Sequence, residues 1–265
     1  MSESRVAWVT GASRGVGRGV ALALGEAGFT VVGTGRKAEA LERTMTEVTD
    51  RGGRGIACVC DHRDDDQVRS VVGRITDEAG RLDVLVNNVF AIPREPIWGR
   101  PFWEQPLAQW DAMHAVGLRS HFVATVLVMP LLLQASPGLV VHISSFAGGS
   151  YQLNVAYGVG KAGVDRMASD MAHELTGRGV AVMSLWPGIV RTEWVLAQDE
   201  LPFPLDHTES PEFTGRAVVA LANDPALLKR TGEVAVVAEL AEAYGFDDID
   251  GTRPRSLRRR THEPR

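Results

Sequence analysis

The chain has 265 residues, with 28 lysines and arginines against 33 aspartates and glutamates, which gives a formal net charge of −5. This mild acidic excess argues against a protein that binds duplex DNA, because such proteins usually carry a strong basic surplus, and we expect no nucleic-acid partner. Hydrophobic residues make up 45% of the chain, enough for a folded core, which excludes general disorder. Two cysteines cannot form a disulfide scaffold. They favour a reducing compartment, so we expect a cytoplasmic protein.

Short β-rich runs alternate with helix-like segments along the chain. We expect strands at 6–10, 30–34, 55–60, 83–87, 139–144, 180–186 and 233–238. The expected helices cover 15–27, 38–51, 65–79, 107–134, 156–178 and 211–222. Strands that are apolar on both faces and alternate with helices indicate a parallel sheet covered on both sides. The pattern predicts an α/β protein with a single Rossmann domain over residues 1–250, built on a doubly wound sheet of seven parallel strands with helices on both faces.

Three further segments have a composition of their own. The stretches 90–106 and 188–210 are long, rich in aromatic residues and proline, and follow expected strands, so we interpret them as substrate loops. The tail, 251–265, holds six arginines, and we expect it to be flexible and solvated, with contact to an anionic membrane or RNA as the alternative. The apolar stretch 121–135 is shorter than the roughly 20 residues that a membrane span needs. We therefore expect it to be a buried helix, with no membrane span.

The first loop, residues 10–17, reads TGASRGVG and joins the first expected strand to the first expected helix. Glycine permits a tight turn and a close approach of backbone N–H groups to a pyrophosphate, and the helix N-terminus then faces the anion. Glycines also occur in plain turns, but the place of this loop favours dinucleotide binding. The candidate binding residues here are Gly11, Ser13, Arg14, Gly15, Val16 and Gly17.

The end of the second strand bears on the choice between NADP(H) and NAD(H). NAD enzymes usually place an acidic residue there, which binds the ribose 2′-hydroxyl. This chain has Gly35 followed by Arg36, and Arg14 lies within the glycine-rich loop. A missing carboxylate and two guanidiniums suit a 2′-phosphate, so we expect NADP(H) to be preferred over NAD(H). The alternative is that both arginines are solvated surface residues.

A tyrosine and a lysine stand four residues apart, at Tyr157 and Lys161, and would share one face of a helix. An ammonium and a positively charged nicotinamide would favour the phenolate and lower the pKa of the phenol. Tyr157 could then exchange a proton with a substrate oxygen near neutral pH. Ser144 and Ser145 follow the fifth expected strand, where a hydroxyl could donate to a substrate carbonyl oxygen. Two serines at a strand end are otherwise turn formers.

Taken together, TGxxxGxG at 10–17, NNV at 87–89, ISS at 143–145, Tyr157-x-x-x-Lys161 and PGIVRT at 187–192 resemble the short-chain dehydrogenase/reductase family over about residues 5–238. The resemblance implies a one-domain Rossmann fold, a nicotinamide cofactor and a homodimer or homotetramer. It implies that Tyr157 is the catalytic acid/base, that Lys161 holds the nicotinamide ribose and that Ser145, with Ser144 as the alternative, orients the substrate. The further cofactor contacts that it implies are Asp61, Asn87, Pro187, Gly188, Ile189 and Thr192.

One position departs from the family pattern, which has an asparagine where this chain has Gly117 in the sequence WDAMHAVGL. In the family that asparagine helps to hold a water beside the lysine in a proton relay. The same VGL form occurs in one subgroup of the family, together with the strings GVGKA and SLWPGIV, so we interpret Gly117 as a subgroup trait. The alternative is a catalytically weak or inactive member that binds the nucleotide as a sensor or scaffold. His114, one turn earlier, could assist the relay or simply pack within the helix.

The substrate class follows from apolar residues near the expected cleft, which are Phe90, Ile92, Trp98, Phe102, Trp103, Phe146, Tyr151, Trp194 and Phe203. Such a lining favours a small apolar ketone, aldehyde or alcohol, of a steroid-like or aromatic kind, although half or more of these side chains could simply pack the loops. The sequence therefore predicts an oxidoreductase, an NADPH-dependent carbonyl reductase. An epimerase or dehydratase using the same Tyr–Lys pair is less favoured. No histidine spacing resembles a metal site.

Overall fold

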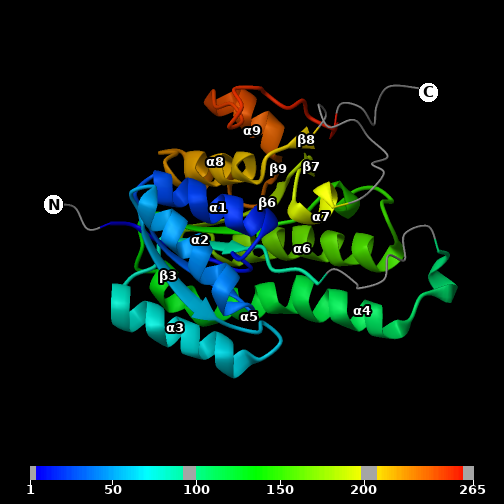
Figure 1. Cartoon of the computed structure of the whole chain (residues 1–265), viewed down its shortest axis with the longest axis horizontal. Coiled ribbons are helices and arrows are strands. Elements are labelled where there is room, and N and C mark those ends of the chain that lie inside the picture. Colours follow the sequence, from blue (N-terminus) through cyan, green and yellow to red (C-terminus); the bar gives the residue numbers. More distant parts are fainter. Residues whose placement is uncertain (1–3, 92–99, 198–207, 259–265) are drawn as a thin grey trace.

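The computed structural model describes residues 4–91, 100–197 and 208–258 (Figure 1). Seven strands form one parallel sheet in the order β3-β2-β1-β4-β5-β6-β9. Their bounds are Val6–Val9 (β1), Thr30–Gly35 (β2), Arg54–Val59 (β3), Val84–Asn87 (β4), Gly138–Ile143 (β5), Val180–Trp186 (β6) and Val234–Val236 (β9). The predicted doubly wound, seven-stranded parallel sheet is confirmed, and so is the Rossmann-type α/β fold.

Helices cover both faces of this sheet (Figure 1). On one face lie α1 (Gly15–Glu26), α2 (Ala38–Asp50), α8 (Pro211–Ala222) and α9 (Val237–Tyr244), whose apolar side chains share one core cluster. On the other lie α3 (Asp65–Ala79), α5 (Ser120–Leu132) and α6 (Val155–Glu174), which share the second cluster. The strand residues alternate between the clusters: Ala7 and Val9 of β1 belong to the first, and Trp8 between them belongs to the second. Both faces of each central strand are therefore buried.

The predicted helix over 107–134 is present but is not one regular helix. It consists of α4 (Leu107–His114), a π-helical segment (Ala115–Arg119) and α5, with Gly117 buried in the π-helical segment. Extra residues inserted in this way are frequent at functional sites. The combined helix, Leu107–Leu132, is by length and composition apolar enough to cross a membrane. In this structure it packs on the sheet, with Ala124 and Val128 fully buried.

Two parts of the C-terminal half differ from the sequence prediction. The last strand is only Val234–Val236, and α9 begins at Val237, where the sequence predicted strand as far as 238. Its run of apolar residues fits either a strand or the buried start of a helix, and packing decided for the helix. The segment 188–210 contains the paired strands β7 (Ile189–Val190) and β8 (Thr208–Glu209) and the short helix α7 (Glu193–Leu196), which were not predicted.

The beginning of the arginine-rich tail contacts the domain, although Arg253 and Arg255 are exposed. Ser256 is buried and its hydroxyl donates to Glu239 at 2.7 Å. Arg258 lies 3.2 Å from the Glu239 carboxylate, with its guanidinium over the Trp186 ring. Arg253 pairs with Asp247. These ion pairs hold the segment against the domain as far as residue 258, and the last arginines of the tail lie outside the described residues.

The strand order places β1 and β4 side by side at the centre of the sheet. The chain leaves β1 and β4 toward opposite flanks of the sheet, which creates a crevice at their carboxyl ends where ligands bind in folds of this kind. Because the strands are parallel, the loops after β1, β2, β3 and β4 all leave this same edge of the sheet.

Candidate active site

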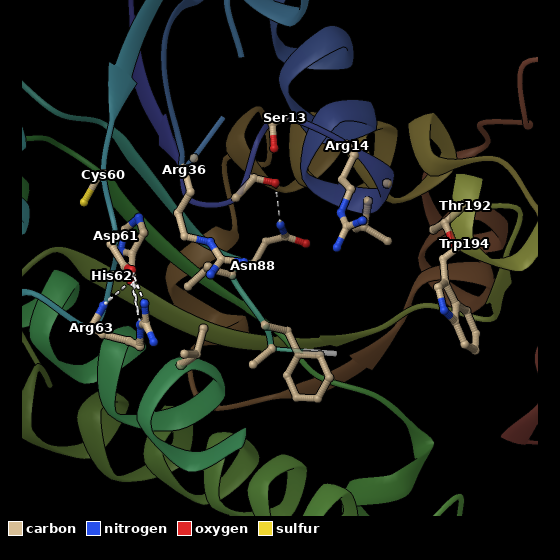
Figure 2. Close-up of a pocket in the computed structure, with 18 of the residues that line it drawn as sticks. Ser13, Arg14, Arg36, Cys60, Asp61, His62, Arg63, Asn88, Thr192 and Trp194 are labelled. Atoms are coloured by element: carbon tan, nitrogen blue, oxygen red, sulfur yellow. Dashed lines mark hydrogen bonds and ion pairs between the residues drawn. The ribbon is translucent and has the colours of Figure 1, made fainter. Parts of the chain in front are cut away.

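A cavity of about 590 Å³ lies at the carboxyl ends of β1 to β4 (Figure 2). Ligand pockets usually have volumes of about 300–1,000 Å³, so this cavity is large enough for an extended ligand. Eight residues that the sequence predicted as cofactor contacts line it: Gly11, Ser13, Arg14, Gly15, Val16, Arg36, Asp61 and Thr192. The structure adds others that the sequence analysis did not assign to cofactor binding, among them His62, Arg63, Asn88, Val89, Phe90, Glu193 and Trp194.

The glycine-rich loop is built around close backbone contacts. A Cβ on Gly17 would lie 2.3 Å from both the Gly11 oxygen and Nδ2 of Asn88, so no side chain fits there. Gly11 and Gly15 have φ angles of +71° and +55°, which favour glycine. The amide of Asn88 donates to the Thr10 oxygen at 2.9 Å and ties the loop to the end of β4. The loop thus forms a cradle that glycine keeps open, as a pyrophosphate site requires.

A carboxylate already lies at the start of helix α1. The Gly15 N–H donates to Oε2 of Glu193 at 2.9 Å, across 178 residues of sequence. Free N–H groups and the helix dipole attract anions at a helix N-terminus, and the side chain of Glu193 acts here as that anion. The residues present therefore fit the phosphate groups of a dinucleotide. Glu193 directly follows the predicted Thr192, but nothing in the sequence indicated that it reaches this loop.

Positive charge gathers beside the cavity, at the end of β2. Arg14 and Arg36 reach into the cavity in Figure 2 and also line an adjoining hollow of about 550 Å³, together with Arg18, Lys37 and Arg43. Arg18 pairs with Glu47, and Arg43 pairs with Glu39. Within the described part of the chain, Arg14, Arg36 and Lys37 have no ion pair within 4 Å, so their charges are available to a ligand.

Asp61 lies at the rim of the cavity but is held by a neighbour. The guanidinium of Arg63 donates to both carboxylate oxygens, from Nε at 3.1 and 3.2 Å. These hydrogen bonds, strengthened by the charges of Arg63 and Arg36, lower the pKa of Asp61 to about 2. The carboxylate is therefore ionised at neutral pH and faces the cavity together with Arg63 (Figure 2).

The cofactor contact of Asn87 stays a prediction, and the structure leaves this residue out of the lining of the cavity. Asn87 is fully buried at the end of β4, and its amide donates to the Thr125 hydroxyl of α5 at 2.9 Å. The next residue, Asn88, lines the cavity instead. Successive side chains of a strand point to opposite faces, so a single step of register determines which of the two asparagines is available to a ligand.

Ser145, Tyr157 and Lys161 come together as the sequence predicted. Ser145 precedes a short 3₁₀ turn, Phe146–Gly148, and its hydroxyl is hydrogen-bonded to the Tyr157 phenol. Asn154 caps the first turn of α6 through the Tyr157 N–H, at 2.8 Å. One turn later, Nζ of the buried Lys161 donates to the Ile143 oxygen at 2.9 Å. The less favoured Ser144 donates to the Lys161 backbone oxygen at 3.2 Å.

Burial sets the protonation of this group. It raises the pKa of Tyr157 above its ordinary value, an effect only partly opposed by the hydrogen bond from Ser145. The predicted lowering of this pKa also requires the charge of a bound nicotinamide, and it stays a prediction for the cofactor complex. Burial also lowers the pKa of Lys161 to about 8, with the Asp165 carboxylate acting in the opposite direction. At pH 7 Tyr157 is a neutral phenol that can donate a proton.

Phe90 links these three residues to the cavity. It lines the cavity, and its ring packs edge-on against Tyr157, with centroids 5.5 Å apart. Ser145, Tyr157 and Lys161 themselves are not among the residues that line the cavity.

Only part of the segment after β6 lines the cavity. Thr192 lines the cavity and caps α7, whereas Pro187, Gly188 and Ile189 do not line it. Gly188 packs instead against the buried Glu209, whose carboxylate accepts its backbone N–H. Burial raises the pKa of this carboxyl to about 8.

Of the apolar residues expected at the cleft, Phe90 and Trp194 line the cavity. Phe146 is buried against Trp186, with ring centroids 5.1 Å apart. Phe102, Trp103 and Tyr151 are exposed. The remaining three, Ile92, Trp98 and Phe203, lie outside the described residues. Within the part of the chain that the structure describes, no group of three or more His, Cys, Asp or Glu side chains could hold a metal ion.

Comparison with known proteins agrees with this geometry. The family model for short chain dehydrogenases matches residues 5–200. The chain belongs to the short-chain dehydrogenase/reductase family. It is 44% identical over 264 residues to dehydrogenase/reductase SDR family member 1 of Mus musculus, covering 94% of this chain and 84% of that protein. The Homo sapiens protein of the same name is 43% identical over 262 residues, covering 93% and 84%.

A solved structure of the same family has a similar fold. A short-chain type dehydrogenase/reductase from Mycobacterium marinum superimposes with a TM-score of 0.79 at 29% identity, covering 88% of this chain and 94% of that one. The expected subgroup, with its VGL, GVGKA and SLWPGIV strings, is confirmed by the similarity to family member 1. This short-chain dehydrogenase is an oxidoreductase, and its family implies a nicotinamide cofactor.

The contact between Glu193 and Gly15 yields a first prediction. A dinucleotide phosphate must displace this carboxylate, and a charge at a helix N-terminus contributes about 0.3–1 kcal/mol. We expect Glu193→Gln to bind NADPH about 2- to 5-fold more tightly in a fluorescence titration. The control is Glu42→Gln, the same loss of charge on the exposed face of α2. Equal affinities in the two variants would contradict competition at Gly15.

Proposed function

We propose that this short-chain dehydrogenase transfers a hydride between NADP(H) and the carbonyl or hydroxyl carbon of a small apolar substrate, acting as a carbonyl reductase. The observation that carries the proposal is the grouping of Ser145, hydrogen-bonded to Tyr157, with Lys161 beside the phenol ring. Phe90 joins this group to the cavity that the glycine-rich loop lines. When bound, the nicotinamide supplies or accepts the hydride. The residues of this chain orient the reactants and move the proton.

Each of the three side chains has a role that its surroundings support. The Tyr157 phenol, neutral at pH 7 because burial raises its pKa, donates the proton to the substrate oxygen. The Ser145 hydroxyl, hydrogen-bonded to that phenol, orients the same oxygen. The Lys161 ammonium, held by the Ile143 carbonyl, supplies positive charge beside the phenol and hydroxyl-binding capacity for a ribose. Holding the two reactants side by side supplies a further part of the acceleration.

Removing the phenol hydroxyl tests the reaction directly. General acid catalysis contributes about 10²–10⁴-fold, so Tyr157→Phe should lose turnover by at least that factor while its affinity for NADPH stays within a factor of about two. Turnover is followed as NADPH oxidation against a panel of apolar ketones and aldehydes. Tyr151→Phe, at an exposed tyrosine, is the matched control. Unchanged turnover in Tyr157→Phe would refute the assignment.

Three charges support NADP(H) as the preferred cofactor. Arg14, Arg36 and Lys37 line the hollow beside the cavity without an ion pair in the described part of the chain. Gly35 leaves the space above Ser13 open, since a Cβ there would lie 3.2 Å from the Ser13 hydroxyl oxygen. Guanidinium groups bind phosphate through charge-assisted hydrogen bonds of about 1.5–3 kcal/mol.

The corresponding variant is Arg36→Ala. We expect its affinity for NADPH to fall about 10- to 100-fold while its affinity for NADH changes less than about threefold, because NADH has no 2′-phosphate. Dissociation constants for both nucleotides are measured by fluorescence titration. Arg166→Ala removes an arginine that pairs with Asp170 on the exposed face of α6 and serves as the control. Equal affinity of the native protein for NADPH and NADH would exclude the preference.

An apolar stripe on α5 supports the proposal of a homodimer or homotetramer. Phe122 and Val126 of α5 are at least half exposed, Leu133 directly after this helix is 45% exposed, and Val155 and Val159 are exposed on α6. Exposed apolar side chains gathered on one helix face can mark an interface, and a second copy of the same stripe is self-complementary across a two-fold axis. Families of this type are usually oligomeric, which makes a second copy the occupant we propose.

Light scattering after size exclusion tests this interface. Val126→Arg places a charge in the middle of the stripe and should convert the oligomer to a smaller species, because an unpaired charge in an apolar interface is costly. Leu228→Arg, at a similarly exposed leucine outside the stripe, should leave the mass unchanged. A native protein that elutes as a monomer at all concentrations would overturn the proposal.

A further inference from the structure

Gly117 and Phe90 occupy one shared space. Gly117 is buried in the π-helical segment between α4 and α5. A Cβ at this position would lie 2.7 Å from Cδ2 and 3.1 Å from Cε2 of Phe90. Phe90 belongs to the loop after β4, 27 positions earlier in the chain. Its ring therefore fills the place that a side chain at position 117 would need, and the family's asparagine could not stand there beside it.

The same ring contacts both residues of the Tyr–Lys pair. It meets Tyr157 at an interplanar angle of 76°, with the ring centroids 5.5 Å apart. Nζ of Lys161 lies 5.0 Å from the centroid of Phe90 and 5.8 Å from that of Tyr157. Both distances are within the range for an ammonium attracted to an aromatic face. Lys161 is buried, so this attraction is little screened by water.

We propose that Phe90 is a positioning residue for the Tyr157–Lys161 pair, and that Gly117 is the small residue that makes room for its ring. This inference rests on the proposed hydride transfer. The ring holds the phenol by edge-to-face packing and stabilises the charged form of the neighbouring ammonium. An asparagine at 117 would act through hydrogen bonds, whereas Phe90 acts through its π face and excludes water from the same space.

The protonation of Lys161 has to be judged against the titratable groups around it. Asp165, one turn further along α6, favours the ammonium. His121 on α5 and His142 on β5 are fully buried, and burial keeps the pKa of both imidazoles well below the ordinary value, so they stay neutral. Tyr157 stays protonated because burial raises its pKa. Removing the π face of Phe90 should therefore destabilise the Lys161 ammonium and lower the pH at which it is lost.

The charge of Lys161 can be read without any substrate. The chain has three lysines, Lys37, Lys161 and Lys229, so lysine labelled with ¹³C at Cε gives three NMR signals, assigned with Lys37→Arg and Lys229→Arg. In Phe90→Leu, which keeps apolar bulk but removes the ring, the titration midpoint of Lys161 should move to lower pH. The signals of Lys37 and Lys229 should not move. Phe90→Tyr, which restores an aromatic face, should return the midpoint toward the native value.

The second readout is turnover. Phe90→Leu should lower kcat about 5- to 30-fold, the range expected for a partly desolvated cation–π contact. KM for NADPH should stay within a factor of about three, and the alkaline limb of the kcat profile should shift to lower pH. Gly117→Ala should displace the ring and reproduce both shifts, and the double variant should lose no more than Phe90→Leu alone. Gly73→Ala, on the open face of α3, is the control for adding a methyl group to a helix.

The proposal would be overturned if the titration midpoint of Lys161 in Phe90→Leu equalled that of the native protein. It would also be overturned if the losses of kcat in the two single variants multiplied in the double variant. A protein that turns over no carbonyl substrate would contradict the proposed function instead. The NMR titration would still decide whether Phe90 stabilises the ammonium.

Discussion

The burial of one ammonium group holds the site together. Nζ of Lys161 donates to the carbonyl of Ile143, the last residue of β5, and the Ser144 hydroxyl donates back to the Lys161 carbonyl. These two hydrogen bonds fasten α6 to the carboxyl end of the central sheet. Burying a charge is costly unless it is paired and hydrogen-bonded, and the lowered pKa of Lys161 reflects that cost. Tyr157, one turn earlier on α6, takes its position from this attachment.

The cavity depends on contacts that only glycine allows. Gly17 lies against the Gly11 carbonyl, and Asn88 joins the glycine-rich loop to the end of β4. Backbone N–H groups of the loop therefore face the crevice between β1 and β4. One of them, the N–H of Gly15, donates a hydrogen bond to the carboxylate of Glu193. Phe90 continues from the same strand end into the space at Gly117. The chain after β4 thus contacts both halves of the site. The Asn88 amide holds the glycine-rich loop, and the Phe90 ring packs beside the Tyr157–Lys161 pair.

The departure at Gly117 changes the chemistry around the lysine without removing the lysine. Where the family pattern has a polar side chain, this protein has an aromatic ring 5.0 Å from Nζ. The π-helical segment keeps Gly117 buried and brings it against the ring. An attraction between a cation and a π face needs no ordered water, so the protonation of Lys161 is controlled here by burial, by Asp165 and by Phe90.

The sequence by itself determined the order of strands and helices, because strands buried on both faces are apolar throughout and alternate with amphipathic helices. It also determined the Tyr157–Lys161 pair and the glycine-rich loop, since both patterns lie within one local element. It did not assign Asn88 to the cavity, which this residue lines beside the buried Asn87, because strand register is set by the packing of the whole sheet. The contacts of Glu193 with Gly15, and of Phe90 with Gly117, were decided only by the tertiary structure. Each joins segments far apart in the chain, and their separation is fixed by how the helices pack on the sheet.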